Sequence, residues 1–65
     1  MKNLYEVYCG NIGKGHAGHN RKEAETVFSH YVGLSANGIG RAAGEDVTLF
    51  MNGEIVKEFL GEYGA

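Results

Sequence analysis

The stretch Asp46-Val-Thr-Leu-Phe-Met-Asn-Gly-Glu-Ile-Val-Lys-Glu-Phe59, near the end of the 65-residue chain, decides the fold. Within it, Asn52-Gly53 separates two short runs that are rich in β-branched and aromatic residues. An Asn-Gly pair in this setting is the strongest local signal for a β-hairpin, because both residues tolerate the positive φ of a tight turn. The sequence therefore predicts a hairpin over residues 46–60.

The loop length of this hairpin sets the face on which each side chain lies. A two-residue turn would pair Phe50 with Ile55 and mix apolar and polar side chains on both faces. A three-residue loop over residues 51–53, with Gly53 as a bulge in positive φ, would shift the pairing by one residue. We favour this loop because it gathers apolar side chains on one face, interrupted only by Lys57. That face would hold Val47, Leu49, Ile55 and Phe59, and the other would hold Thr48, Phe50, Glu54, Val56 and Glu58.

The chain ahead of the hairpin predicts one strand, one loop and one helix. Residues 3–9 alternate as a strand does, with Tyr5, Val7 and Cys9 on one side and Leu4, Glu6 and Tyr8 on the other. Residues 10–19 contain four glycines, and this density predicts a loop. Asn20 and Glu23 have the spacing of a capping box, which predicts a helix over residues 20–37 that stops at Asn37-Gly38.

These elements predict a single α+β domain over residues 1–65. Its layout would be β-α-β-β, with one helix on one face of a three-stranded, mainly antiparallel sheet. The crossover rule combined with a tight hairpin favours the last strand in the middle of the sheet. A chain of 65 residues has a thin core and is marginally stable as a monomer, so self-association is an expected source of stability.

Composition narrows the functional classes. A formal net charge of −2 provides no basic face for general nucleic-acid binding. A single cysteine, Cys9, allows no internal disulfide and suits a reducing compartment. The N-terminal residues form no apolar run, so we expect a cytoplasmic protein with no membrane association. No residue set indicates catalysis or a cofactor, and a domain this small has little material to exclude water from a reaction centre, so we expect a non-enzymatic protein.

The helix-free face of the sheet is the leading candidate for a functional site. It would expose more apolar and aromatic surface than a small domain leaves in water as a cluster, within an acidic rim. Such a face predicts a homodimer interface or the binding site of a partner protein, although scattered apolar residues are also normal on protein surfaces. The interface residues predicted on this basis are Leu4, Tyr8, Thr48, Phe50, Val56 and Glu58.

A second candidate is the glycine-rich segment at the start of the helix. Glycines let backbone N–H groups approach an anion, and a helix N-terminus adds partial positive charge, so a phosphate or nucleotide is a possible ligand. The spacing completes neither the phosphate-loop nor the dinucleotide-binding motif, and a plain connector is the alternative. A metal site is not predicted, because only one close histidine pair occurs. The residues of this candidate are Gly13, Lys14, Gly15, His16, His19, Asn20 and Arg41.

The helix start, the Gly40-Arg-Ala-Ala-Gly-Glu45 turn and the Asn52-Gly hairpin together resemble a class of small uncharacterised bacteriophage proteins. The resemblance covers about the last two-thirds of the chain. It implies a phage origin, a short β-α-β-β domain and a location in the host cytoplasm, with no assigned activity. The resulting hypothesis is a protein that binds itself or a host protein through its helix-free face. A phosphate or nucleotide binder is the alternative, and a structural subunit of a larger assembly is a third possibility.

Overall fold

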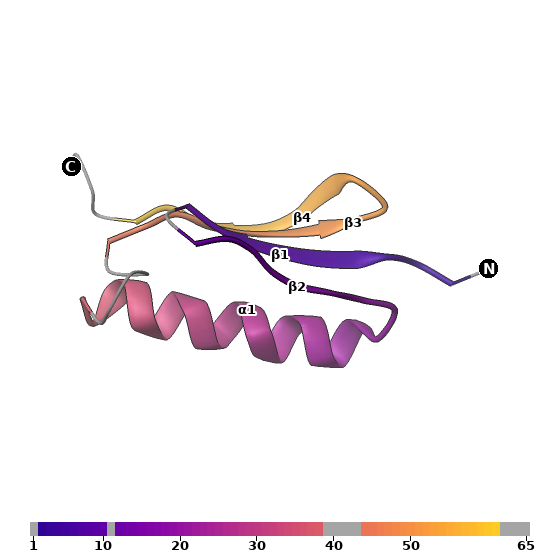
Figure 1. Ribbon diagram of the computed structural model, residues 1–65, viewed down its shortest axis with the longest axis horizontal. Coiled ribbons are helices and arrows are strands. Elements are labelled where there is room, and N and C mark those ends of the chain that lie inside the picture. The colour runs from indigo at the N-terminus through magenta and orange to yellow at the C-terminus, as the bar shows by residue number, and fades with distance from the viewer. Residues whose placement is uncertain (1, 11, 39–43, 62–65) are drawn as a thin grey trace.

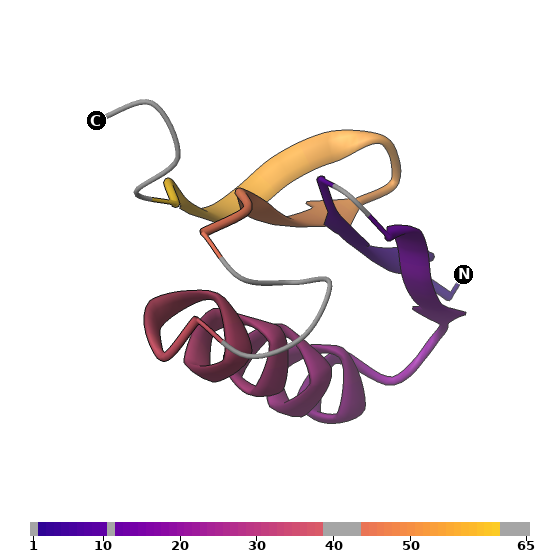
Figure 2. The same cartoon turned by 60° about the vertical axis from the view of Figure 1, so that its left-hand side comes forward.

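The computed structural model describes residues 2–10, 12–38 and 44–61. In chain order, they form strands β1 (Tyr5–Cys9) and β2 (Gly13–Gly18), helix α1 (Arg21–Ala36), and strands β3 (Val47–Met51) and β4 (Glu54–Phe59). Among these residues the four strands make one antiparallel sheet in the order β2-β1-β3-β4. Figures 1 and 2 show the helix packed along one side of this sheet. The predicted α+β class is confirmed, but the three-stranded β-α-β-β layout is wrong.

The additional strand comes from the glycine-rich segment that was predicted to be a loop. Residues 13–18 pair with β1 as an edge strand, and the register shifts between Val7 and Tyr8, where Gly15 is the extra residue of a bulge. Glycine has a weak strand preference, but here the backbone is held by a ladder to β1. A Cβ atom built on Gly15 would lie 2.5 Å from the Tyr31 Oη atom, so glycine allows helix α1 to pack closely over β2.

The extra strand also changes the order of the sheet. The crossover through α1 starts at β2 rather than at β1, and β1 fills the space between β2 and β3. Because β1 is antiparallel to both neighbours, β2 and β3 run in the same direction. The last strand, β4, is therefore at the edge of the sheet, and the prediction that it lies in the middle is wrong.

The hairpin between β3 and β4 is closed by a two-residue turn, so the predicted three-residue loop is wrong. Asn52 and Gly53 have φ angles of 53° and 86°, and Met51 pairs with Glu54. Positive φ at both central residues is characteristic of the type I′ turn, whose twist matches that of the flanking strands. Phe50 then lies opposite Ile55. This pairing takes Ile55 off the core face where it was predicted to lie, and 58% of its surface is exposed.

A bulge farther along β4 corrects the register. The pairing shifts between Leu49 and Phe50, so that Leu49 lies opposite Lys57 and Val56 is the extra residue. Because of this shift, Phe59 lies opposite Val47 and packs against the core, as the sequence predicted. Glu54, predicted on the helix-free face, lies instead opposite Met51, which packs against the core. The bulge exists, but it lies in the strand rather than in the turn.

The core lies between α1 and the two central strands. The predicted inward side of β1 is confirmed, because Tyr5, Val7 and Cys9 are all buried. They form the main cluster together with three residues from the helix and from β3. Within the part of the chain that the structure describes, the buried apolar residues are Tyr5, Val7, Cys9, Ala24, Val47 and Leu49. So small a cluster gives the marginal core expected from a short chain.

Both ends of α1 are fixed by side chains. The Asn20 Oδ1 atom accepts a hydrogen bond of 3.0 Å from the Glu23 N–H group, which confirms the predicted N-cap. At the other end, the buried Ser35 hydroxyl donates a hydrogen bond of 2.7 Å to the Glu45 carbonyl oxygen. This bond joins the end of the helix to the segment that leads into β3, and thereby places the helix against the central strands.

Candidate functional site

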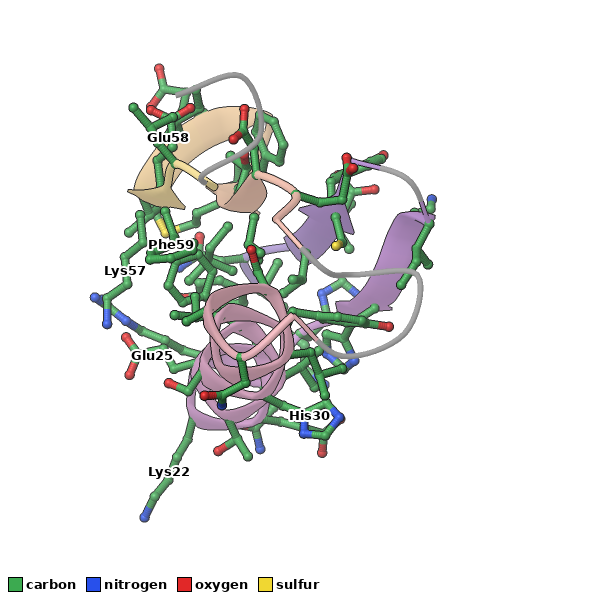
Figure 3. The ribbon with its side chains drawn as sticks, turned by 90° about the vertical axis from the view of Figure 1, so that its left-hand side faces the viewer. Lys22, Glu25, His30, Lys57, Glu58 and Phe59 are labelled. Carbon is green, nitrogen blue, oxygen red and sulfur yellow. The ribbon has the colours of Figure 1, made fainter. Side chains whose placement is uncertain are left out.

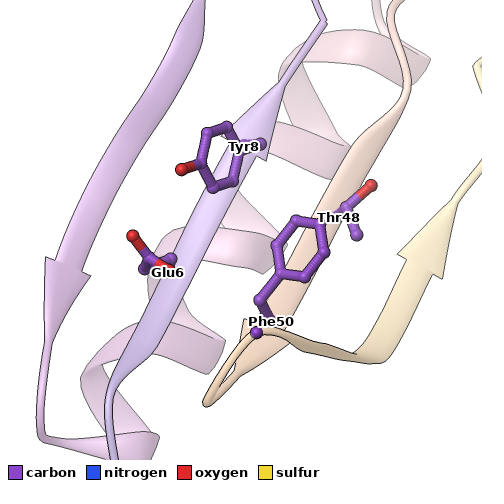
Figure 4. A pocket seen from close by; sticks show the side chains of 5 residues that line it. Glu6, Tyr8, Thr48 and Phe50 are labelled. Atoms are coloured by element: carbon purple, nitrogen blue, oxygen red, sulfur yellow. The ribbon is translucent and has the colours of Figure 1, made fainter.

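The helix-free side of the sheet, which we call the outer face, carries two rows of side chains. The strand pairing sets the members of each row, because residues directly opposite each other point to the same side of a sheet. From β2 to β4, the first row is Lys14, Tyr8, Thr48 and Glu58, and the second is Ala17, Glu6, Phe50 and Ile55. Figure 4 shows Glu6, Tyr8, Thr48 and Phe50 on the side of the sheet that faces away from the helix.

Two aromatic side chains lie at the centre of the outer face. Tyr8 and Phe50 pack edge to face, with ring centroids 5.4 Å apart and an interplanar angle of 87°. This is the geometry that aromatic pairs prefer. The two rings belong to a hollow of about 430 Å³, which is also lined by Glu6, Thr48 and Gly53. The hollow combines the two aromatic rings with the Glu6 carboxylate and the Thr48 hydroxyl group. It can therefore accept an apolar side chain of a partner, while Glu6 and Thr48 form hydrogen bonds with polar groups beside that side chain.

Charge on the outer face is distributed unequally between the two edge strands. Lys14 in β2 lies 3.3 Å from Glu6, measured from the Lys14 Nζ atom to the Glu6 Oε2 atom. About half of the Lys14 side chain remains exposed. At the other edge, Figure 3 shows Glu58 on the side of β4 away from the helix. The outer face thus carries a lysine, paired with Glu6, at the β2 edge and a carboxylate, Glu58, at the β4 edge.

The structure brings together four of the six predicted interface residues. Tyr8, Thr48, Phe50 and Glu58 share the two rows described above. The other two, Leu4 and Val56, lie at the margins. Leu4 precedes β1 and is held at the hairpin tip, where its N–H donates to the Asn52 Oδ1 atom at 2.9 Å. Val56 is the extra residue of the β4 bulge, and 37% of its surface is exposed.

The prediction omitted four outer-face residues. Lys14 and Ala17 were omitted because β2 was not recognised as a strand. The residues of β2 other than glycine are Lys14, His16 and Ala17. Three residues interrupted by a bulge are too few to show the alternation that indicates a strand. Ile55 was omitted because its register depended on the turn type. Glu6 was placed on the correct side of β1 but was not included in the interface.

The predicted phosphate-binding residues are not brought together. Lys14 lies opposite Tyr8 on the outer face, whereas His16 lies opposite Val7 on the inner face. The Asn20 side chain already accepts from the helix N-terminus, and the His19 Nδ1 atom is 3.0 Å from the Asn3 carbonyl oxygen. Gly13 pairs with Cys9 at the end of the β1–β2 ladder, and Gly15 packs under Tyr31. Arg41 lies outside the described residues.

His16 has the most enclosed imidazole. Its side chain is 15% exposed, and the Nε2 atom is buried with no hydrogen-bond partner among the described residues. The nearest acidic atom with which it pairs is Glu23 Oε1, 3.9 Å away. Across the described ranges, no three His, Cys, Asp or Glu side chains gather closely enough to hold a metal ion.

On the inner side, an ion-pair cluster joins the helix to the edge strand. The Glu25 Oε2 atom lies 3.0 Å from Arg21 Nε and 3.9 Å from Lys57 Nζ. The hydrogen bond from Arg21, followed by the charge of Lys57, lowers the pKa of Glu25 below its ordinary value. Figure 3 shows Lys57 and Phe59 on the helix side of β4, opposite to Glu58. Lys57 and Glu58 are consecutive residues of β4, so their side chains point to opposite faces of the sheet.

Comparisons with models of known protein families, with curated proteins and with solved structures found no match to this chain. Within residues 2–10, 12–38 and 44–61, no helix combines the length and the hydrophobicity that crossing a bilayer requires.

Proposed function

We propose that this protein acts by binding another protein through the outer face, and that it does not catalyse a reaction. The observation that supports this proposal is the Tyr8–Phe50 pair, which lies in a hollow on a sheet face that no described element covers. Aromatic side chains surrounded by polar groups are characteristic of the central part of protein–protein interfaces. Here the surrounding groups are Glu6, Lys14 and Thr48.

Energetic considerations support the same proposal. Among the described residues six apolar ones are buried in the core, and 36% of Tyr8 and 58% of Ile55 are exposed in the single chain. Covering the outer face would remove additional apolar surface from water at about 25 cal/mol per Å². For a small domain, this gain is a substantial fraction of its total stability. The partner is a second copy of the chain or a host protein, as the resemblance to small phage proteins suggests.

The phosphate-binding alternative has less support. Its candidate residues lie on opposite faces of β2, and the helix N-terminus is occupied by Asn20. No second observation on the described residues points to an anion at this place. Protein binding is therefore the function that the geometry favours.

The experiment compares Phe50→Glu with Ser29→Glu, which makes the same change of charge at an exposed position of the helix. Self-association is measured by sedimentation, and partners are captured from a host lysate on immobilised protein. Wild type and Ser29→Glu should both self-associate or capture the same host protein, and Phe50→Glu should lose this binding while keeping its circular dichroism spectrum. Binding that survives in Phe50→Glu, or a wild type that neither self-associates nor captures a protein, would overturn the proposal.

A further inference from the structure

Taking the outer face as the binding surface proposed above, we infer that its partner is a second copy of this chain. We propose that two copies stack outer face to outer face about a twofold axis that runs parallel to the strands. In this arrangement, β2 of one copy lies over β4 of the other. The inference follows from the charges and side-chain sizes in the two rows of the outer face.

The first row has charges of opposite sign at its two ends, so two such rows placed in opposite order bring unlike charges together. It begins with Lys14 on β2 and ends with Glu58 on β4, at the same level along the strands. Three strand spacings separate the two charges, or about 14 Å, so they do not pair within one copy. A twofold axis parallel to the strands reverses the order of the strands in the second copy. It leaves each residue at the same position along the strand direction. Lys14 of each copy then lies over Glu58 of the other. In the middle of the row, Tyr8 of each copy lies over Thr48 of the other.

The alternative axis runs in the same plane but perpendicular to the strands. This axis keeps the order of the strands in the second copy, but it places the first row of each copy over the second row of the other. Lys14 would then lie over Ala17 of the other copy, and Glu58 would lie over Ile55. Lys14 would keep only its own Glu6 as a partner, and the Glu58 carboxylate would be covered by an apolar group with no cation opposite it, which is unfavourable because a buried charge needs a partner. The charge of Glu58 therefore selects the axis parallel to the strands, whereas both axes would give the aligned packing common in β-sandwiches.

The second row fits the same axis by size and charge. Ala17, the smallest side chain of the row, lies over Ile55, which is the most exposed outer-face apolar residue at 58%. A small residue facing a large one lets the two layers interdigitate. Glu6 lies over Phe50 of the other copy and keeps its own ion pair with Lys14 at 3.3 Å. The Lys14 ammonium of each copy is therefore shared by its own Glu6 and by Glu58 of the other copy.

The size of the outer face sets the strength of the dimer. Four strands spaced by about 4.8 Å and five residues with a rise of about 3.4 Å give a face of about 320 Å² in plan. A standard interface buries about 800 Å² on each partner, and smaller interfaces are typical of transient complexes, so we expect a weak dimer. Sedimentation from about 10 μM to about 1 mM would detect it, because dimer formation depends on concentration by mass action.

The experiment is a charge exchange at the two edges of the outer face. Lys14→Glu and Glu58→Lys should each weaken dimerisation by about tenfold, because symmetry converts two attractions into two repulsions. The double variant is made in a Glu6→Gln background, because Lys14→Glu would otherwise place a second carboxylate beside Glu6. It should restore the Kd to within about threefold of the Glu6→Gln parent, because both pairs between the copies are re-formed with reversed sign. Lys22→Glu and Glu54→Lys make the same charge changes elsewhere and should leave the Kd unchanged. Each variant is checked for a wild-type circular dichroism spectrum.

The outcomes separate this inference from the proposed function. If Phe50→Glu abolishes the dimer but the double charge variant does not restore affinity, this arrangement is overturned while the outer face remains the binding surface. A wild type that stays monomeric up to about 1 mM also overturns the inference, whereas capture of a host protein lost in Phe50→Glu would still support the proposed function. A dimer that is insensitive to both Phe50→Glu and the charge variants would overturn both, and would indicate pairing between edge strands.

Discussion

A methyl group added at Gly15 tests whether the glycine-rich segment is a strand packed under the helix. A Cβ atom at this position would lie 2.5, 2.6 and 2.7 Å from the Oη, Cε2 and Cζ atoms of Tyr31. Carbon atoms in contact prefer about 3.5–4.0 Å, so the tyrosine ring would have to move by about 1 Å and lose part of its packing. Overpacking of this kind costs about 1–3 kcal/mol.

The net effect of Gly15→Ala includes a smaller term of opposite sign. Alanine restricts the unfolded chain and thereby stabilises the fold by about 0.4–1 kcal/mol. We therefore expect a net loss of about 1–2 kcal/mol in the free energy of unfolding. A domain of 65 residues typically has about 3–10 kcal/mol in total, so this loss is measurable by urea unfolding followed by circular dichroism.

Two further variants identify the cause. Gly33→Ala is the matched control, because a Cβ atom there would meet nothing within 4 Å and alanine favours the helix by about 0.5–1 kcal/mol. In a Tyr31→Leu background the ring atoms near Gly15 are gone, so Gly15→Ala should cost nothing. An equal cost of Gly15→Ala in both backgrounds, or no cost in the wild-type background, would refute the close packing of β2 against the helix.

Two other predictions concern the hairpin turn and the ion-pair cluster. Asn52→Ala should cost about 2–3 kcal/mol in urea unfolding, because it loses the bond to the Leu4 N–H and places alanine in the left-handed region, whereas Asn52→Gly should cost only about 1 kcal/mol. Equal losses would contradict the type I′ turn. The pKa of Glu25 is lower in the folded chain than the ordinary pKa of a glutamate. Its ion pairs therefore stabilise the fold fully above the ordinary pKa, and this stabilisation is lost as the pH falls through the lower pKa of the folded chain. Glu25→Gln should therefore lower the thermal midpoint at pH 7 but not near pH 2, and a difference that persists at about pH 2 would argue against the pairs with Arg21 and Lys57.

The local chemistry of the sequence was sufficient to predict several elements. Asn20 with Glu23 marked the start of the helix to within one residue, because a cap depends only on groups a few positions apart. Alternation over residues 5–9 identified the buried side of β1 for the same reason. The Asn52-Gly53 pair placed the hairpin. In each of these cases the deciding interaction lies within one turn or one strand.

The register of the hairpin needed more than its own pattern. Clean segregation of apolar side chains favoured a bulged loop, but the turn adopts the two-residue type I′ form and the strand absorbs the extra residue at Val56. Phe50 lies on the outer face in either case, because buried Val47 and Leu49 fix the faces of β3. The prediction of an outward Phe50 thus held, whereas that of an inward Ile55 did not.

The sequence by itself determined the helix, the first strand, the hairpin and the central aromatic side chains of the candidate site. Only the tertiary structure decided that residues 13–18 form a strand, which gives the outer face its basic edge at Lys14. The physical reason is that a glycine-rich segment has little strand preference of its own. Its conformation comes from hydrogen bonds to β1 and from the Tyr31 ring, which belongs to the helix and packs over Gly15.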